Sequence, residues 1–329
     1  MRMAAIILSL VFSTPAMAQP DLGRIVENHV MPGYRALAEE AADLEASARA
    51  DCSPDNAGLI RAYHNAFNAW VRVSHLRFGP SETNDRAFAL AFWPDPRGST
   101  PKALGQLIRY ADPVVASAED FATVSVASRG FYALEYLLFD PQFTDTEDRD
   151  YLCDLTQALA TDIARNANAI LDDWQSGYAD LMANPGNDTY RLETEASRQL
   201  FTALSTGLEF TSQARLGRPL GTFERPRPNR AEAHRSGRSL QHVILSLTAT
   251  RELASLMSGE DAGIDSAFEN AIKRATDLED PVFAGVVDPQ SRFRVEVLQQ
   301  DIDSIRQQIA EDLGPSLGIA AGFNSLDGD

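Results

Sequence analysis

The sequence predicts an all-α protein built from two four-helix-bundle-like halves. Apolar residues recur at steps of three and four along most of the chain, which is the spacing of one helix face. Alternating strand patterns are almost absent, and residues 282–287 form the only candidate β-strand. The stretch ANPGND, residues 183–188, breaks the helical pattern into two groups of four segments. Each group can bury its own apolar stripes as a bundle.

Four helices are expected before this break. In the second of them Tyr63, Phe67 and Trp70 keep a three- and four-residue rhythm, and Asp55 is a plausible N-cap. The first and fourth carry similar stripes, from Tyr34 to Leu44 and from Leu155 to Trp174. The four expected ranges are 22–48, 55–78, 114–139 and 147–182.

Four more helices are expected after the break. The last is the clearest in the chain, because its apolar residues between Val295 and Leu313 step by 3, 4, 3, 4 and 4. The four expected ranges are 189–215, 229–257, 262–278 and 290–312. Residues 78–100 and 217–230 are expected to be non-helical, and loops of this length in a compact domain are often functional.

Composition limits the kinds of partner. The 329 residues are 44% apolar and 23% charged, which is typical of a globular protein large enough for one or two domains. The formal net charge is −18, so the surface repels phosphate backbones. A nucleic-acid partner is therefore not expected.

The first 18 residues have the layout of a secretory signal peptide. Arg2 precedes an apolar run that is too short to span a bilayer, and Ala16-Met17-Ala18 forms an A-x-A cleavage site. We expect cleavage near Ala18, halves at residues 19–186 and 187–329, and a periplasmic or secreted protein that is soluble after cleavage. No transmembrane segment is expected in the mature chain.

The two cysteines, Cys52 and Cys153, fit an exported protein. An oxidising compartment and an even count favour one disulfide, and both residues fall at predicted helix ends. We predict that they are bonded. The alternative is two unrelated buried thiols.

The stretch GFYALEYLLFD, residues 130–140, is the principal candidate for a site. Tyr132 and Glu135 are three apart and therefore neighbours on one helix face, and Gly130 leaves room for a ligand or another helix. Phenol and carboxylate oxygens suit ferric iron or another hard cation. The alternative is a core helix in which Tyr132 packs and Glu135 faces water or an arginine. Spacing alone leaves both interpretations open.

This stretch and several others resemble the imelysin-like family, whose hallmark is G-x-H-x-x-E on a helix. The other matching features are Gly79-Pro80 after a Trp-containing helix, FWPDPRG at 92–98, Glu232…Ser236…Ser239-Leu240, and GFNSLDGD at 322–329. The resemblance covers the mature chain and implies an all-α fold of two bundle-like halves with a pocket between them. Members of the family are periplasmic or surface proteins associated with iron uptake or described as peptidases, and some related proteins bind polysaccharide.

The sequence departs from the family at the histidine of the motif, where it has Tyr132. Zinc hydrolysis needs about three protein ligands and an activated water, and no H-E-x-x-H occurs here. The departure weakens a peptidase function. An oxygen-rich iron site is more compatible with tyrosine at this position, since tyrosine oxygens can ligate iron.

The resemblance implies an exported imelysin-like binding protein associated with the acquisition of iron or another metal. The expected partner is a metal ion or small anionic ligand, together with an envelope iron-uptake system, and iron is the candidate cofactor. Tyr132 and Glu135 are the expected metal ligands. The expected pocket residues are Gly130, Trp93, Arg97, Glu232 and Ser236. The alternatives are an imelysin-type metallopeptidase and a metal-free scaffold that binds polysaccharide or a partner.

Residues 215–238 contain seven arginines in an otherwise acidic chain. They could hold a carboxylate, a phosphate or an acidic sugar, or they could pair with neighbouring acids and fix a loop. The five histidines are interpreted as surface or half-buried side chains. Glu135 is expected in a polar pocket between the halves, satisfied by Arg97, by an arginine of 225–238 or by a metal.

Overall fold

The computed structural model describes residues 19–145 and 149–318. The predicted signal peptide and the terminal GFNSLDGD stretch lie outside these ranges. The described residues are almost entirely helical, and their only β feature is one antiparallel bridge between Thr222 and Arg225. The all-α prediction, with no sheet beyond a minor hairpin, is confirmed.

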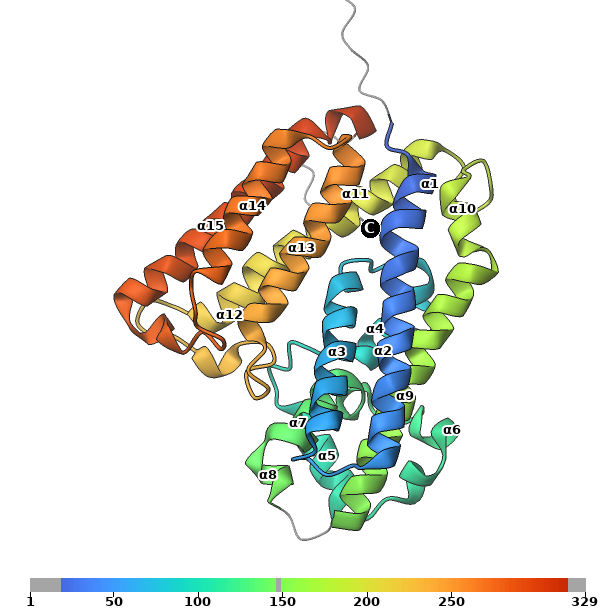
Figure 1. Ribbon diagram of the computed structural model, residues 1–329, viewed down its shortest axis with the longest axis vertical. Helices are drawn as coiled ribbons and strands as arrows, with labels where there is room; N and C mark the ends of the chain where they lie inside the picture. Colours follow the sequence, from blue (N-terminus) through green and yellow to red (C-terminus); the bar gives the residue numbers. More distant parts are fainter. Residues whose placement is uncertain (1–18, 146–148, 319–329) are drawn as a thin grey trace, which may run out of the picture.

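The N-terminal half is a bundle of four long helices, drawn from blue to green in Figure 1. In this half α2 packs against α3 and α9, and α7 packs against α9. Its helices are α1 (Leu22–Ile25), η1 (Val26–Val30), α2 (Met31–Ala50), α3 (Ala57–Val73), α4 (Arg86–Leu90), α5 (Ser99–Arg109), α6 (Ala118–Phe121), α7 (Gly130–Phe139), α8 (Pro141–Thr144), α9 (Arg149–Asp173), η6 (Trp174–Tyr178) and α10 (Ala179–Ala183). The core of this half includes Tyr34 and Trp174, whose stacked rings are both fully buried.

The C-terminal half, drawn from yellow to red, is a second bundle of four long helices. Here α14 packs against α13 and α15, and α11 packs against both α13 and α15. Its helices are α11 (Glu193–Glu209), η7 (Phe210–Leu216), α12 (Gly217–Leu220), α13 (Ser239–Ser258), α14 (Ala262–Thr276) and α15 (Pro289–Asp312). Short 3₁₀ segments occur in both halves: η2 (Gly79–Ser81), η3 (Thr83–Asp85), η4 (Pro113–Ala116), η5 (Val126–Ser128), η8 (Pro228–Arg230), η9 (Ala284–Val287) and η10 (Pro315–Leu317).

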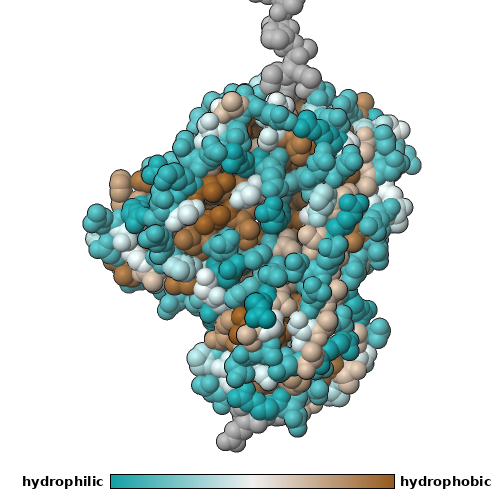
Figure 2. Space-filling model, viewed as in Figure 1, coloured by the Kyte–Doolittle hydropathy of each residue, from teal (hydrophilic) through white to brown (hydrophobic). Residues whose placement is uncertain are grey.

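The two halves meet along α13, which packs against α3 and α1 of the N-terminal half. Figure 2 shows hydrophobic side chains gathered over the C-terminal half on this face, in the region of α13 and α14, while most of the surrounding surface is hydrophilic. The turn between α10 and α11 contains the predicted 183–188 break. The division of the chain into two domains at residue 186 stays a prediction.

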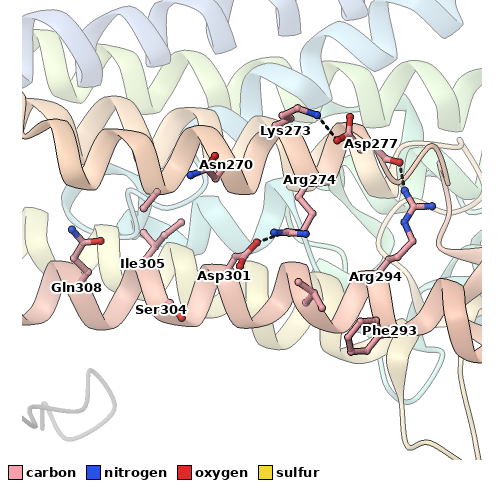
Figure 3. A pocket seen from close by; sticks show the side chains of 12 residues that line it. Asn270, Lys273, Arg274, Asp277, Phe293, Arg294, Asp301, Ser304, Ile305 and Gln308 are labelled. Carbon is pink, nitrogen blue, oxygen red and sulfur yellow. Dashed lines mark hydrogen bonds and ion pairs between the residues drawn. The ribbon is translucent and has the colours of Figure 1, made fainter.

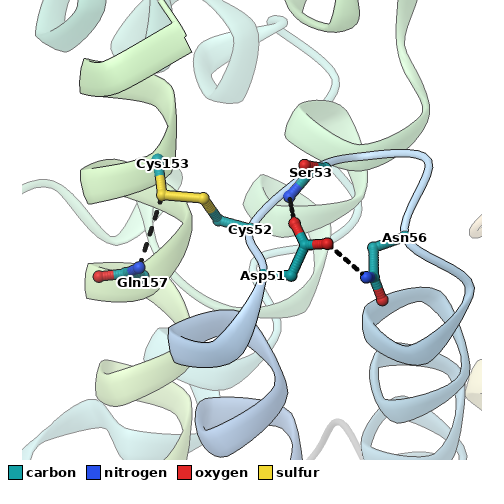
Figure 4. The surroundings of a disulfide bond; sticks show 6 residues. All are labelled: Asp51, Cys52, Ser53, Asn56, Cys153 and Gln157. Atoms are coloured by element: carbon teal, nitrogen blue, oxygen red, sulfur yellow. Dashed lines mark hydrogen bonds between the residues drawn. A yellow bond between two sulfur atoms is a disulfide. The ribbon is translucent and has the colours of Figure 1, made fainter.

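Cys52 and Cys153 form a disulfide with a Cα–Cα distance of 5.3 Å. The bond joins the turn after α2 to the first part of α9 (Figure 4). Around it, Asp51 accepts hydrogen bonds from the backbone of Ser53 and the side chain of Asn56, which orders the turn into α3. The predicted disulfide is confirmed.

Two predicted helices are wrong in extent. The range 114–139 is divided into short pieces, because the side chains of Ser117 and Ser125 each cap a new turn and Gly130 has a φ of +73°. The range 229–257 is helical only from Ser239, apart from the 3₁₀ turn η8, and its earlier part is a loop that carries Glu232.

The two stretches expected to be non-helical are also partly helical, because 78–100 contains α4 and 217–230 contains α12. The run at 282–287 ends in the 3₁₀ turn η9. Within the described ranges, no helix combines the length and the apolar character needed to cross a membrane.

Candidate functional site

Gly130 starts α7 against the end of α4. Its backbone is in the left-handed region, and a Cβ there would overlap the carbonyl oxygens of Ala89 and Leu90. Only glycine meets both conditions without strain. The space beside Gly130 is therefore filled by the backbone of another element, which fixes where α7 projects Tyr132 and Glu135.

Tyr132 reaches across to the C-terminal half and donates a hydrogen bond of 2.5 Å to Glu232 Oε1. Arg215 Nε donates to the other oxygen, Oε2, at 2.7 Å, and His242 Nδ1 lies 3.2 Å from that same oxygen. All four side chains are buried. We call Tyr132, Glu232, Arg215 and His242 the Glu232 network.

The remaining Arg215 donors are also engaged. Its Nη1 donates to the hydroxyls of Thr211 and Ser246, at 3.1 and 3.2 Å, and its guanidinium lies over the ring of Phe210. A buried ion pair is tolerated when further hydrogen bonds satisfy its remaining atoms. Arg215 therefore serves as the counter-ion of Glu232 inside the protein.

Glu135 takes its hydrogen bonds from the loop before α13. Its Oε1 accepts from the backbone N–H of Ser236 at 2.9 Å and from the Ser236 hydroxyl at 2.8 Å. Glu135 is buried, as the sequence predicts. The bonding partner differs from the expected arginines, because Arg97 is exposed and the loop folds its own serine onto the carboxylate.

The surroundings of Glu232 and Glu135 shift the pKa values of the two carboxylates in opposite directions. Burial raises the pKa of Glu232, but Arg215 and then His242 more than offset it and hold the pKa at about 2. Burial also raises the pKa of Glu135, and there the Ser236 hydrogen bonds only partly oppose it. Burial and the Glu232 charge raise the pKa of Tyr132 well above 10. Tyr132 is therefore a neutral phenol that donates to an ionised Glu232.

A pocket of about 300 Å³ lies between the halves beside this network. Its volume is at the lower end of small-molecule sites. Aromatic rings from both halves line it, together with hydroxyl and amide groups of α11 and with Tyr132, Arg215 and Glu232. The aromatic lining residues are Trp70, Phe88, Trp93 and Phe210.

Trp93 separates this pocket from a smaller cavity of about 130 Å³, and both hollows are lined by Trp93 and Tyr132. The Trp93 ring lies 6.1 Å from the Tyr132 ring in a stacked arrangement and meets Phe210 edge-on. The pocket residues Trp93 and Glu232 were singled out from the sequence. Arg97 and Gly130 line neither hollow.

A third hollow, of about 700 Å³, lies between α14 and α15 on the outer side of the C-terminal half (Figure 3). Its charged side chains pair with one another, since Arg274 binds Asp301 and Lys273 binds Asp277. Arg294 donates to the backbone carbonyl of Asp277. Both carboxylates of this hollow are thus engaged by cations of its own walls, and Arg294 is engaged by a backbone carbonyl.

The polar groups at Tyr132 and Glu135 do not fit a metal ion in this arrangement. Tyr132 gives its proton to Glu232, Glu232 is neutralised by Arg215, and Glu135 Oε1 already has two donors. Within residues 19–145 and 149–318, no three His, Cys, Asp or Glu side chains are grouped so as to hold a metal. The metal-ligand role of Tyr132 and Glu135 stays a prediction, and their bonding argues against it.

Two members of the Glu232 network, Arg215 and His242, are not among the site residues that the sequence predicts. Arg215 belongs to the arginine-rich segment, but nothing in the sequence indicates which arginine meets Glu232. The interpretation of the histidines as surface or half-buried was wrong for His29, His75 and His242, all of which are buried. His29 and His75 meet at 3.0 Å between their Nε2 atoms.

Known proteins match this chain over most of its length. The family model for imelysin (Peptidase_M75) matches residues 30–309. The chain belongs to the imelysin family. Two solved structures share the imelysin-like fold. An imelysin-like protein from Psychrobacter arcticum 273-4 is 18% identical, with a TM-score of 0.74 over 92% of this chain and 96% of that one.

The second structure, from Parabacteroides distasonis ATCC 8503, is described as "a putative iron-regulated protein A precursor". It is 13% identical, with a TM-score of 0.71 over 89% of this chain and 94% of that one. No curated protein matches this imelysin. The resemblance expected from the sequence is therefore confirmed for the family and the fold.

Proposed function

We propose that this imelysin is an exported binding protein and that its ligand occupies the pocket of about 300 Å³ between the two halves. The observation that supports this best is the composition of the pocket. Aromatic rings from both halves face a few convergent polar groups, and the buried Glu232 network forms part of the wall. Mostly apolar pockets with a few placed polar groups are typical of small-molecule sites. The signal-peptide layout of residues 1–18 supports export.

The proposal includes a role in the acquisition of iron or another metal. The description of the Parabacteroides relative as iron-regulated supports a connection with iron for proteins of this fold. The Tyr132 hydroxyl and Oε1 of Glu135 already make hydrogen bonds within the protein, which argues against a bare ion, so the metal would arrive within a small organic complex. Stacking aromatic rings and hydroxyl groups suit such a ligand. The expected envelope iron-uptake partner stays a prediction.

A metallopeptidase is less well supported. The sequence has no H-E-x-x-H motif, and the carboxylates of the site are held by an arginine and a serine. Metal-assisted hydrolysis needs an open coordination position on a cation held by several ligands. The described side chains around Tyr132 offer no such set.

The test is a thermal-shift panel on the mature chain, residues 19–329. The probes are ferric citrate, ferric dihydroxybenzoate and ferric acetohydroxamate, each beside its iron-free chelator. Thr206→Phe fills the pocket from α11, and Thr248→Phe is the matched control. Both threonines are half-buried and return a hydrogen bond to their own helix, but Thr248 does not line the pocket.

We expect at least one chelate or chelator to raise the melting temperature of the wild type and of Thr248→Phe but not of Thr206→Phe. Circular dichroism checks that both variants keep the helical fold. If no probe stabilises the wild type, or if Thr206→Phe responds as the wild type does, the proposal is wrong.

A further inference from the structure

The smaller cavity, of about 130 Å³, is lined by three arginines of the arginine-rich segment. It lies where residues 92–96 of the N-terminal half meet α7, α12 and the segment 229–235. Its lining includes Trp93, Asp95, Glu135, Arg218, Arg230 and Arg235.

Arg218 has no acceptor in the described protein. Its guanidinium lies over the Trp93 ring at 5.5 Å, and its Nε is buried without a hydrogen-bond partner. No ion pair joins it to any residue of the described ranges. Buried donors are nearly always satisfied, and an unsatisfied one costs about 1–3 kcal/mol. The Nε of Arg218 is therefore free to donate to an acceptor held in this cavity.

Arg230, an exposed arginine, adds a second positive charge to the lining of the cavity. Its side chain, too, has no carboxylate partner among the described residues. Burial and the neighbouring Arg230 charge both lower the pKa of Arg218. Other arginines of the segment are paired, since Arg215 binds Glu232 and Arg235 binds Asp140. The expected pairing with acids thus holds for Arg215 and Arg235 in the described ranges, and of the three arginines that line the cavity only Arg235 has a carboxylate partner.

The two acidic residues of the cavity are held by the protein itself. Asp95 accepts the backbone N–H groups of Arg97 and Thr100, at 3.3 and 2.8 Å. Glu135 accepts both Ser236 donors through Oε1. The bonds from Arg97 and Thr100 fix Asp95 within its own loop, and those from Ser236 fix Glu135 beside the loop before α13. Neither carboxylate makes an ion pair with Arg218 or Arg230.

We propose that this cavity binds a small oxyanion, a carboxylate or a phosphate, between Arg218 and Arg230. Guanidinium groups match both oxyanions through parallel N–H donors. The Arg218 guanidinium lies over the Trp93 ring, 5.5 Å from its centroid, and this cation–π contact restricts the side chain before the ligand arrives. The cavity volume admits a single acidic group with little attached to it, and an acidic arm of a larger molecule would also fit.

The experiment is isothermal titration calorimetry of the mature chain with inorganic phosphate and, separately, with acetate and succinate. The variants are Arg218→Gln and Arg230→Gln. Arg225→Gln is the matched control, because Arg225 is an exposed arginine of the same segment that does not line the cavity. Within the described residues, neither Arg218 nor Arg230 makes a side-chain hydrogen bond that the substitution would remove. The variants are therefore expected to fold.

We expect phosphate or a carboxylate to bind the wild type and Arg225→Gln equally and to bind each cavity variant at least about tenfold more weakly. Binding should also weaken as salt is added. The stronger of the two classes identifies the acidic group. Absence of binding by all three probes, or equal binding by Arg218→Gln and the wild type, would overturn the proposal. Neither result bears on the Thr206→Phe test of the larger pocket.

Discussion

Glu232 keeps its charge in the protein interior because three side chains, drawn from both halves, are arranged around it. A buried carboxylate is costly unless a counter-ion and further donors satisfy it. Arg215 supplies the counter-ion, and the Tyr132 hydroxyl supplies the donor from the other half. With its pKa raised, Tyr132 keeps its proton and donates a hydrogen bond to Glu232. We interpret Tyr132 as a structural bridge between the halves.

His75 should make the stability of the protein depend on pH. Burial, followed by the neighbouring His29 and Arg215, lowers the pKa of His75 well below 6.5. As pH falls below about 6.5, His75 therefore binds a proton in the unfolded chain but not in the folded chain. The free energy of unfolding decreases over this pH range. We expect the urea midpoint of the wild type to fall more between pH 7.5 and pH 5.5 than that of His75→Gln, which does not titrate. Equal falls would contradict the assignment.

The site could be predicted from the sequence only in part. The spacing of Tyr132 and Glu135 places both on one helix, and the apolar residues around them predict that Glu135 is buried. The partners of the two residues lie 100 and 101 positions away, at Glu232 and Ser236. No local pattern fixes such pairings, because they depend on how the two halves dock. The metal expected at this pair was an inference from donor chemistry that ignored these partners.

At the scale of the element, the start of α7 depends on Gly130. We expect Gly130→Ala to destabilise the protein by more than the roughly 1–3 kcal/mol of a strained backbone alone, because the new methyl also meets the carbonyls of α4. Gly105→Ala is the control. Gly105 lies within α5 with open space where an alanine methyl would stand, so alanine should be neutral or stabilising by about 0.5–1 kcal/mol. Urea unfolding measures both, and a neutral Gly130→Ala would contradict this account of α7.

Helix periodicity predicted the long helices well and the short ones poorly. The range 290–312 is α15 to within one residue, because a continuous apolar stripe buries it along its length. The range 114–139 failed because serine caps and a left-handed glycine outweigh helical spacing. The expected helix 229–257 includes the loop before α13. This loop is not an α-helix, and it supplies Glu232 and Ser236.

In the whole molecule, the disulfide limits the unfolded chain. Cys52 and Cys153 are separated by 101 positions, and closing such a loop contributes up to about 4.7 kcal/mol in the chain-entropy model. We expect reductant to lower the melting temperature of the mature wild type. The double variant Cys52→Ser/Cys153→Ser should melt at the lower temperature with or without reductant. A wild type that melts unchanged in reductant would contradict this role for the bond.

The two bundles meet so that Tyr132 of one half satisfies the buried Glu232 of the other, and we propose that the pocket beside them takes an organic ligand and not a bare ion. The decisive measurement is calorimetric titration of residues 19–329 with ferric ion delivered from its nitrilotriacetate complex, corrected for a protein-free titration. Wild type, Tyr132→Phe and Glu135→Gln are compared. We predict that the two variants bind ferric ion to the same extent as the wild type, because a chelate in the pocket needs neither side chain as a metal ligand. One ferric ion bound per wild-type chain, and lost in either variant, would show instead that Tyr132 and Glu135 are metal ligands.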